Sequence, residues 1–514
     1  MILMSNLRCF GNIGGLTSLN VTRKFFWSIL LITLLAFALR VFRLDAQSLW
    51  WDEIMPVLIA QLPFPQWFQP VFQDRGYPPG FYLLMTAWMQ FGAGEFFARI
   101  VTVSFGTLTI PALARLGRRV GGDPVGIVAA VLMALSPFFI WYSQEMRMYA
   151  PLTFAAVASS WLFVELLHRP RVRIAVGLFA VNLFGMYTHY LFGIFLLAQF
   201  IFFAMARGRS PRALRLWFAA TFGAGAFFVP WLVALQLVPI QGRPNLAWIP
   251  NAQWYDPALS LYHVLLGAAQ DPNVFWNWMT PLLGLALAVY GVVKHWKTDA
   301  RENTRYLLTW LLAPILFLFL LSIPIPQRSL YVDRYLTPYA PALLILIAMG
   351  AVALYRRQRV LLGIAALLAL IPLGLSLANM YFVPRYARDD WRGMTNFLQQ
   401  NADASREAVL LDLSLHLPFD LYQRDALTRI ERPFSDQESV DAWAASSENF
   451  RGYPRVWLVT NAMPINVHRF YPDEAGQRAF AKQDAFKRAM DARYSVLQEK
   501  WFPGLMLTQY QVTP

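Results

Sequence analysis

Cysteine and charge are scarce in this 514-residue sequence. Cys9 is the only cysteine, so no internal disulfide bond can form. Charged residues make up 14% of the chain and hydrophobic residues 57%, a balance that excludes an ordinary soluble enzyme. Carboxylates are also rare within the apolar stretches, where Glu165 is the clearest example and lies at one end, beside His168 and Arg169. Ion pumps usually place carboxylates at mid-membrane, so this scarcity argues against a pump.

Other familiar sites are missing as well. No set of His, Cys, Asp and Glu has metal-binding spacing and no cofactor is indicated, while the involvement of a divalent cation stays open. The chain has no obvious pair of matched halves, which weakens a transporter interpretation. The net charge of +14 does not predict nucleic-acid binding, because residues 380–514 hold 16 basic and 17 acidic residues. The excess lies in short loops, where it meets anionic lipid headgroups.

What the sequence has in abundance is apolar stretches of spanning or near-spanning length. A helix needs roughly 20 apolar residues to cross a bilayer, and about 17 at the short end. About eleven transmembrane helices are therefore predicted. They fall near 24–42, 98–114, 123–140, 150–167, 173–188, 190–206, 214–237, 279–295, 305–323, 336–354 and 360–379.

Basic residues alternate between the gaps that separate these stretches. One set of alternate gaps holds twenty Lys and Arg residues and the other set only seven. Short loops rich in Lys and Arg stay in the cytoplasm. We therefore expect an integral protein of the cytoplasmic membrane with a cytoplasmic N-terminus and an extracytoplasmic C-terminal part.

One apolar segment, residues 79–91, tests this topology. It has only 13 residues, a length more typical of interfacial or re-entrant segments than of spans. If it crossed the membrane, every later loop would invert. We therefore predict a long outer loop, residues 43–97, with a helix at 79–91 lying along the outer membrane face.

The chain after residue 379 reads as a mixed α/β domain, residues 380–514. Helices are predicted at 390–400 and 479–493, and strands at 408–413, 455–460 and 505–512. His416 and His468 are isolated and read as surface residues. About 135 residues suffice for one small domain.

Adjacent carboxylates occur at the start of the first outer loop. Asp52 and Glu53 follow Trp50 and Trp51 directly. An interfacial aromatic anchor followed by a helix N-terminus explains the pattern, since Asp caps helices and Glu favours the first turn. A carboxylate held close to the bilayer also suits a general base that accepts a proton from an attacking hydroxyl.

Polar residues suited to an anionic substrate recur in the later outer loops. Arg has the planar fork that binds phosphate through two parallel hydrogen bonds, although Arg147 also fits an ion pair with Glu145. His189, a lone histidine, is by itself more typical of a structural residue than of a catalytic one. The candidates are Arg75 in the first loop, Glu145, Arg147 and Tyr149 after the third span, His189 and Tyr190 in a short hairpin, and Arg334 and Tyr335 before the tenth span.

Several of these strings resemble one family. Trp-Asp-Glu ending at Glu53, Tyr-Pro-Pro from Tyr77, Phe-Ala-Arg ending at Arg99, Ser-Gln-Glu-Met-Arg-Met-Tyr (143–149), Thr-His-Tyr (188–190) and Asp-Arg-Tyr (333–335) are similar to the bacterial family-39-type glycosyltransferases. These are related to protein O-mannosyltransferases and the lipid A aminoarabinose transferase and have the GT-C fold. The resemblance covers roughly residues 25–380, giving a GT-C transmembrane domain over 1–379.

The resemblance implies an activity and a site. It implies a polyprenyl-phosphate sugar donor and transfer on the outer face with inversion, with Asp52 as the base. The family often has a basic residue or His before Pro-Pro. Here Tyr77 takes that place, and Arg75 is the expected substitute. The acceptor stays open among lipid, glycan and protein.

Two other activities are weighed against this one. A lipid-linked sugar transporter or flippase would need a polar path through the membrane, which the sequence does not show. A polymerase or ligase of lipid-linked oligosaccharides would be expected to place its essential Arg and His in one large outer loop. The candidates here are spread over four loops.

Overall fold

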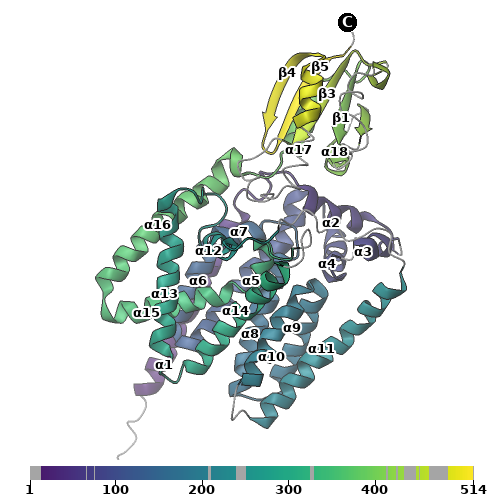
Figure 1. Ribbon diagram of the computed structural model, residues 1–514. Coiled ribbons are helices and arrows are strands. Elements are labelled where there is room, and N and C mark those ends of the chain that lie inside the picture. Colours follow the sequence, from purple (N-terminus) through teal and green to yellow (C-terminus); the bar gives the residue numbers. More distant parts are fainter. Residues whose placement is uncertain are drawn as a thin grey trace, which may run out of the picture.

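The computed structural model has a helical part and a smaller sheet part, stacked end to end (Figure 1). It describes residues 13–64, 66–74, 76–205, 210–238, 251–323, 329–412, 415–423, 427–432, 447–450, 452–461 and 484–512.

Seven helices of the described chain are long and apolar enough to cross a membrane, or eight if a bent pair counts as one span. The protein is therefore an integral membrane protein. The seven are α1 (Ile13–Val41), α5 (Glu95–Gly121), α8 (Tyr149–His168), α11 (Pro211–Leu237), α13 (Met279–His295, with the preceding turn η1, Phe275–Trp278), α14 (Arg301–Ser322) and α16 (Arg359–Phe382).

The predicted count of eleven spans is not reached by this measure. The three other predicted stretches are helical, but they form the shorter helices α9 (Val172–Thr188), α10 (Leu191–Met205) and α15 (Pro341–Arg357). At 1.5 Å per residue, a 15-residue helix such as α10 is about 22 Å long, short of a hydrocarbon core of about 30 Å.

The stretch predicted at 123–140 is a broken helix. It forms α6 (Asp123–Leu135) and α7 (Pro137–Ser143), whose axes differ by 63°. The break falls at Ser136-Pro137, because proline disfavours the helical conformation of the residue before it and provides no N–H for the helix ladder. Ser136 then caps α7 by accepting a bond from Phe139 N at 3.4 Å.

The long loop predicted between the first two spans folds into three short helices. They are α2 (Trp51–Gln61), α3 (Phe68–Asp74) and α4 (Gly80–Met89). The segment predicted to lie along the membrane corresponds to α4. Its ten residues make a helix of about 15 Å, half of what a crossing needs.

Two features hold the helical part together. Every residue from Pro341 to Ala351 of α15 is buried, so this helix lies inside the bundle. A polar network joins four other helices: Ser159 donates to Asn182 at 2.7 Å, and Gln199 bonds both Ser159 and Trp217. Buried polar groups remain only where they find such partners.

The C-terminal part is a five-stranded mixed sheet with strand order β2-β1-β3-β5-β4. β1 pairs in parallel with β2 and β3, whereas β5 is antiparallel to β3 and β4. The strands are β1 (Glu407–Asp412), β2 (Thr428–Arg432), β3 (Arg455–Asn461), β4 (Ser495–Phe502) and β5 (Leu505–Gln511). The flanking elements are η3 (Pro384–Tyr386), α17 (Trp391–Asn401), α18 (His416–Tyr422) and η5 (Ser447–Phe450).

The three predicted strands and the helix at 390–400 correspond to elements here. Residues 484–491 are helical, and the earlier residues of the helix expected at 479–493 lie outside the described residues. Both edge strands were missed. β4 is exposed along nearly its whole length and carries Gln, Glu and Lys, so it lacks the apolar alternation of a half-buried strand. His416 begins α18, and His468 lies outside the described residues.

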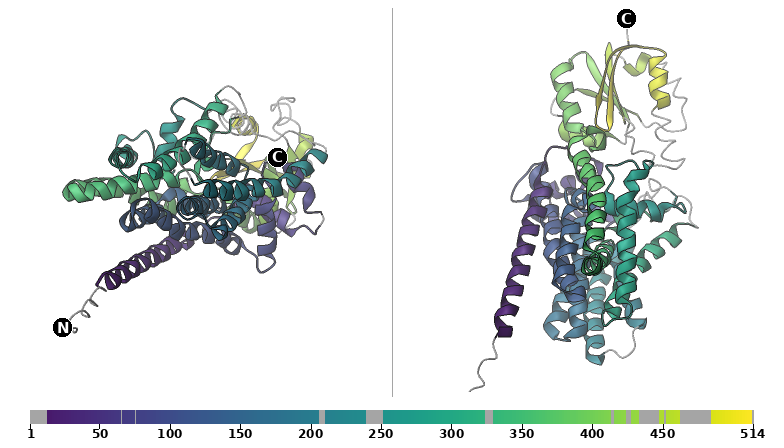
Figure 2. Two further views of the ribbon diagram at one scale, coloured as in Figure 1. Left: turned by 90° about the horizontal axis from the view of Figure 1, so that it is seen from below. Right: turned by 90° about the vertical axis from the view of Figure 1, so that its left-hand side faces the viewer.

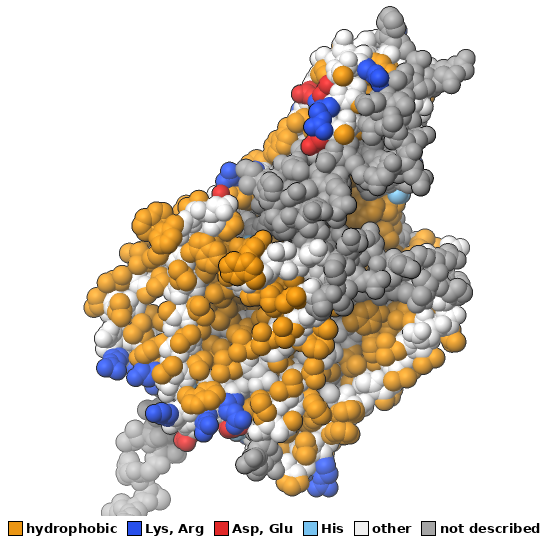
Figure 3. Space-filling view, viewed as in Figure 1, with side chains coloured by type: hydrophobic (Ala, Val, Ile, Leu, Met, Phe, Trp, Pro, Cys, Tyr) orange, Lys and Arg blue, Asp and Glu red, His pale blue; other side chains and the backbone are white. Residues whose placement is uncertain are grey.

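The surface agrees with a membrane location. Hydrophobic side chains cover the helical part, and Lys and Arg gather at its end farthest from the sheet (Figure 3). Views from other sides show α1 at the edge of the bundle and the sheet standing clear of the helices (Figure 2). Of the remaining elements, α12 (Asp256–Leu266) lies toward the sheet-side end of the bundle (Figure 1), and η2 (Asp333–Leu336) contacts it, since Ser260 donates to Asp333 at 2.7 Å.

Candidate active site

The carboxylates of the first loop lie in the first turn of α2. This is a favourable place for negative charge, because the free N–H groups of a helix start carry partial positive charge. Asp52 and Glu53 are neighbours on the helix and differ in direction by about 100°. Their surroundings differ accordingly.

Asp52 meets two arginines from distant loops. Arg334 of η2 donates to Asp52 Oδ2 at 2.6 Å, and Arg147 donates to the Asp52 backbone carbonyl at 3.0 Å. Burial alone would raise the pKa of Asp52, but the two guanidinium groups outweigh it and hold the pKa below the ordinary 3.8. The carboxylate is therefore ionised at neutral pH, and its side chain is still 23% exposed.

Arg147 is nearly enclosed. Its guanidinium lies 4.7 Å from the centre of the Tyr77 ring, an attractive cation–π contact, and its Nε has no hydrogen-bond partner. Arg334 lies 5.9 Å from the centre of the Tyr149 ring. Two arginines predicted from separate loops thus flank the same carboxylate.

Glu53, the alternative catalytic carboxylate of the sequence analysis, has a structural position instead. Arg99 donates to both of its oxygens, at 2.9 and 2.5 Å, and Met146 N donates to Oε1 at 2.8 Å. Trp50 N also donates to Glu53 at 3.4 Å, the reciprocal contact of a helix cap. With no exposure and both oxygens engaged, Glu53 is not available to a substrate.

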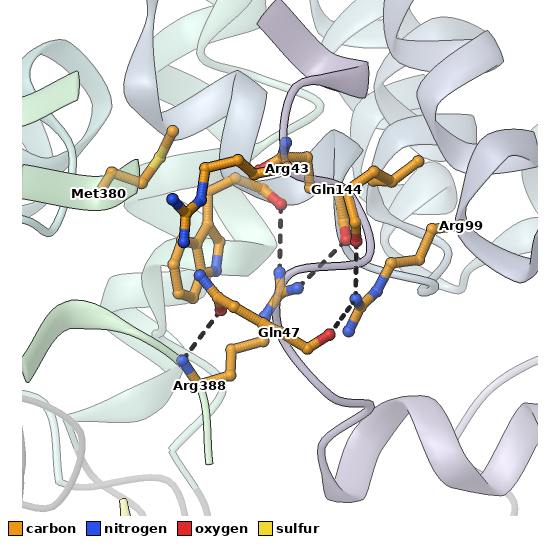
Figure 4. Close-up of a pocket in the computed structure, with 8 residues that line it drawn as sticks. Arg43, Gln47, Arg99, Gln144, Met380 and Arg388 are labelled. Atoms are coloured by element: carbon orange, nitrogen blue, oxygen red, sulfur yellow. Dashed lines mark hydrogen bonds between the residues drawn. The ribbon is translucent and has the colours of Figure 1, made fainter. Parts of the chain in front are cut away.

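Glu145 and Arg388 form a second charged pair. Arg388, from the segment after η3, lies 3.9 Å from both Glu145 Oε2 and Glu53 Oε2. Burial raises the pKa of Glu145 to about 7, although Arg388 opposes this effect. Figure 4 shows Arg388 reaching toward Gln47 and Gln144 in a pocket that Arg43 and Arg99 also line.

Arg388 was missed by sequence reasoning. It belongs to a segment with no recognisable motif, and only the fold brings it to the first loop.

His189 lies at the turn between α9 and α10, edge-on to Tyr77 and Tyr335 at 5.1 and 5.6 Å between ring centres. Burial, with the charges of Arg147 and Arg334, lowers its pKa to about 3, so the ring is neutral. Its Nδ1 accepts a bond from Leu191 N at 3.1 Å, which leaves the proton on Nε2. That buried Nε2 has no partner.

One other candidate, Tyr190, does not join this group. Tyr190 turns toward α11, where its hydroxyl accepts a bond from Trp231 Nε1 at 3.1 Å, because the aromatic cluster of α3, α4 and α11 packs there. Arg75 lies outside the described residues. Tyr77, Tyr149 and Tyr335 do line the site through the ring contacts given above.

Unpaired buried polar atoms mark the site. Buried polar groups almost always find partners, so each exception needs an explanation. Four of them occur on residues predicted to bind substrate: Glu145 Oε1, Arg147 Nε, the Tyr149 hydroxyl and His189 Nε2. Together they offer donors and an acceptor to a polar ligand.

No group of three or more His, Cys, Asp or Glu side chains among the described residues is arranged to hold a metal ion.

A family model matches part of the chain. Residues 76–233 match the model described as dolichyl-phosphate-mannose-protein mannosyltransferase. The matched region includes Tyr77, Arg99, Glu145, Arg147 and His189. The chain resembles the family-39-type GT-C glycosyltransferases. No curated protein sequence matches it.

Solved structures support the same fold. ArnT from Cupriavidus metallidurans in the apo state aligns with a TM-score of 0.54 and 13% identity, over 94% of this chain and 97% of that one. The Archaeoglobus fulgidus oligosaccharyltransferase aligns with a TM-score of 0.51 and 13% identity, over 91% and 71%. Arabinofuranosyltransferase AftD from Mycobacteria aligns with a TM-score of 0.51 and 12% identity, over 96% and 40%. The overall architecture is thus the GT-C fold.

Proposed function

We propose that this protein transfers a sugar from a polyprenyl-phosphate donor to an acceptor hydroxyl at the outer face of the membrane, with inversion at the anomeric carbon. The observation that carries the proposal is the carboxylate of Asp52 flanked by Arg147 and Arg334 beside unpaired buried polar atoms. A neighbour of the same fold, ArnT, has been solved bound to undecaprenyl phosphate.

The donor phosphate is assigned to the two arginines. Cleavage of the sugar–phosphate bond leaves a lipid phosphate, a stable anion that needs cationic stabilisation more than a proton donor. Arg147 has a free Nε, and Arg334 releases Asp52 when its guanidinium turns to phosphate. His189 Nε2–H offers a neutral donor to the same oxygens.

Asp52 is assigned as the base. While Arg334 is bound to it, its pKa is low and it is a weak base. Capture of Arg334 by the donor phosphate weakens that pairing and raises the basicity of Asp52 only when donor is present. The acceptor hydroxyl then loses its proton to Asp52 as its oxygen attacks the anomeric carbon.

The bond changes balance in one displacement. A bond forms between the acceptor oxygen and the anomeric carbon, and the bond from that carbon to the phosphate oxygen breaks. The phosphate keeps the electron pair and Asp52 keeps the proton. A retaining route would need a second carboxylate as nucleophile. Glu53 is bound to Arg99 and does not meet that need.

The outer face is assigned from charge. The basic loops predicted to be cytoplasmic lie at the end of the bundle away from α2, and the sheet part lies beyond α2 (Figures 1 and 3). Positive loops remain in the cytoplasm, so Asp52 and the C-terminal part are assigned to the opposite side.

The test is loss and recovery of a sugar in the cell envelope. Mass spectrometry of lipids, glycans and proteins should show one hexose or pentose missing from a deletion strain. It should return with the wild-type chain and not with Asp52→Asn expressed at the same level. An unchanged envelope in the deletion strain would contradict the proposal.

A flippase is the second function to separate. A flippase would move the lipid-linked sugar to the other side of the membrane without cleaving the sugar from its lipid. Release of undecaprenyl phosphate from a sugar donor by the purified protein in detergent would support transfer, because detergent solution has no membrane to separate two compartments. Activity that requires a sealed vesicle supports the flippase.

A further inference from the structure

We propose that Arg388 is a positioning residue of this site: it holds the Glu145 carboxylate near Asp52 and controls whether that carboxylate is protonated. The inference deepens the proposed function and rests on it for its catalytic consequence only. It also gives the C-terminal part a role, because Arg388 belongs to the segment that joins α16 to α17.

Arg388 is a cation taken out of solvent. Its side chain is 6% exposed, and it donates to the carbonyls of Gln144 and Trp141 at 3.2 and 3.4 Å. Its guanidinium lies 4.5 Å from the centre of the Trp141 ring. These contacts fix the group in direction, yet its Nε has no partner. A buried charge is retained only where opposite charge compensates it.

That compensation comes from two carboxylates, Glu53 first and Glu145 second. Each lies 3.9 Å from Arg388, but both oxygens of Glu53 are already bound by Arg99. The other oxygen of Glu145, Oε1, is buried and has no partner. Arg388 therefore lies beside Glu145 without engaging Oε1.

Glu145 titrates among charges of both signs. The groups that act on it are Arg388 and Arg334, which favour its ionised form, and Asp52 and Glu53, which oppose it. Burial is the largest effect and favours the neutral form. Neutral Glu145 can donate a hydrogen bond to a donor phosphate, whereas ionised Glu145 repels it.

Other contacts hold the Arg388 segment against the first loop. Ser48 donates to the Asp389 carbonyl at 2.7 Å and accepts from Trp391 N at 3.1 Å. Arg392 binds Glu95 at 2.6 Å. The segment is thus bonded through Ser48 to the chain that leads into α2, and through Glu95 to the first residue of α5.

The decisive experiment follows the protonation of Glu145 directly in the full-length protein. Infrared difference spectra across pH should contain a carboxylic-acid band that disappears in Glu145→Gln. In wild-type protein we expect this band to fade as pH rises through about 7. In Arg388→Gln, loss of the nearby cation should move the fading upward by about one pH unit or more.

The matched control is Arg385→Gln. Arg385 belongs to the same segment but donates to the Tyr386 hydroxyl, at 2.6 Å. Its titration should equal that of wild type. If Arg388→Gln does not fold, Arg388→Met keeps an unbranched apolar stem at this position while removing the charge. An unmoved band in the folded charge-free variant overturns the proposal.

A second arm measures binding of undecaprenyl phosphate across the same pH range. Glu145→Gln serves as the reference, because the phosphate titrates equally with both proteins. Relative to this variant, wild-type affinity should fall about tenfold per pH unit above the Glu145 pKa, as linkage requires. In Arg388→Gln this fall should begin at higher pH. An infrared shift without any transfer activity would leave the Arg388 proposal standing and count against the glycosyltransferase.

Discussion

At the scale of single residues, the site separates two adjacent carboxylates by their partners. Glu53 is buried and saturated by Arg99, while Asp52 is partly exposed and paired with a cation that phosphate can attract away. Two carboxylates that look alike in the sequence thus become one structural group, Glu53, and one proposed base, Asp52. The distinction depends on which way each side chain leaves the first turn of α2.

Asp52→Asn and Glu53→Gln should therefore fail in different ways. Asp52→Asn should lower transfer by about 100-fold or more, because a general base contributes 10²–10⁴-fold, while the protein stays folded and binds donor. Glu53→Gln should instead destabilise the fold by about 3–5 kcal/mol, because Arg99 stays buried without its counter-charge. Turnover and thermal unfolding in detergent measure the two effects.

The stability that Glu53 contributes should also depend on pH. Arg99 and its neighbours leave the pKa of Glu53 below the ordinary 4.5 despite burial. The stabilisation from this pair is therefore fully present at neutral pH and is lost only as pH falls below that ordinary value. Wild type should lose thermal stability faster than Glu53→Gln over that acidic range.

Near-normal turnover by Asp52→Asn would remove Asp52 from its assigned role.

Arg147 and Arg334 should each contribute to donor affinity. Alanine at either position removes a charge-assisted contact of about 1.5–3 kcal/mol, so binding of undecaprenyl phosphate should weaken roughly ten- to hundred-fold. Lysine should rescue only part, since it lacks the planar fork. Arg385→Ala is the control and should bind normally. Unchanged affinity in both alanine variants contradicts the phosphate assignment.

At the scale of elements, the break between α6 and α7 leads into the loop that carries Arg147. A helix ends with carbonyls that lack partners, and within a membrane water cannot supply them. Arg40 of α1 supplies donors instead, to Met133 O at 3.2 Å and Ala134 O at 3.4 Å, and its Nε donates to Ser143 Oγ at 3.1 Å. One buried arginine thus joins both halves of the bend.

Arg40→Met should destabilise this bend. It leaves carbonyls of α6 unsatisfied, each at about 1–3 kcal/mol, so the thermal midpoint in detergent should fall by several degrees. Arg43→Met is the matched control, because the Arg43 guanidinium lies over the exposed Phe382 ring, a contact of about 0.5–1 kcal/mol, whereas Arg40 bonds the helix ends at the bend. Equal thermal unfolding midpoints for Arg40→Met and wild type would show that other groups satisfy the α6 carbonyls equally well.

The same elements show what a sequence can and cannot predict. Each of the eleven predicted apolar runs falls on helix, one of them broken, because hydrophobic length is a local property, but only seven or eight of the described helices are long enough to span. The break at Ser136-Pro137 also had a local cause, but the role of Arg40 did not, since its partners lie on other helices.

The candidate site also combines features that local sequence predicts with features that depend on packing between distant segments. Motif strings located Asp52, Arg147 and Arg334, yet the pairing of Asp52 with Arg334 spans 282 positions and depends on how the helices pack. Arg388 had no motif, and Tyr190 had one but faces an aromatic cluster. Local pattern thus finds candidate residues, and only the packed fold decides which of them meet.

At the scale of the whole molecule, charge and shape make one joint prediction. The loops richest in Lys and Arg lie at the end of the bundle opposite the sheet part, with α2 and α4 between the bundle and the sheet (Figures 1 and 3). With α4 too short to cross, the N-terminus and the basic loops share one side, and Asp52 shares the other with the sheet.

Single cysteines in a Cys9→Ser background can test this topology in intact cells with a membrane-impermeant thiol reagent. Asp299 and Gln358 are exposed positions in basic loops, and Ala93 and Ala404 are exposed positions after α4 and in the C-terminal part. Cysteine at Ala93 and Ala404 should label strongly, and cysteine at Asp299 and Gln358 only after permeabilisation, because positive loops stay inside. Labelling of the Asp299 and Gln358 positions in intact cells with none at Ala93 or Ala404 would reverse this orientation. It would put Asp52 and Arg147, which are bonded to each other, on the cytoplasmic side and would contradict transfer at the outer face.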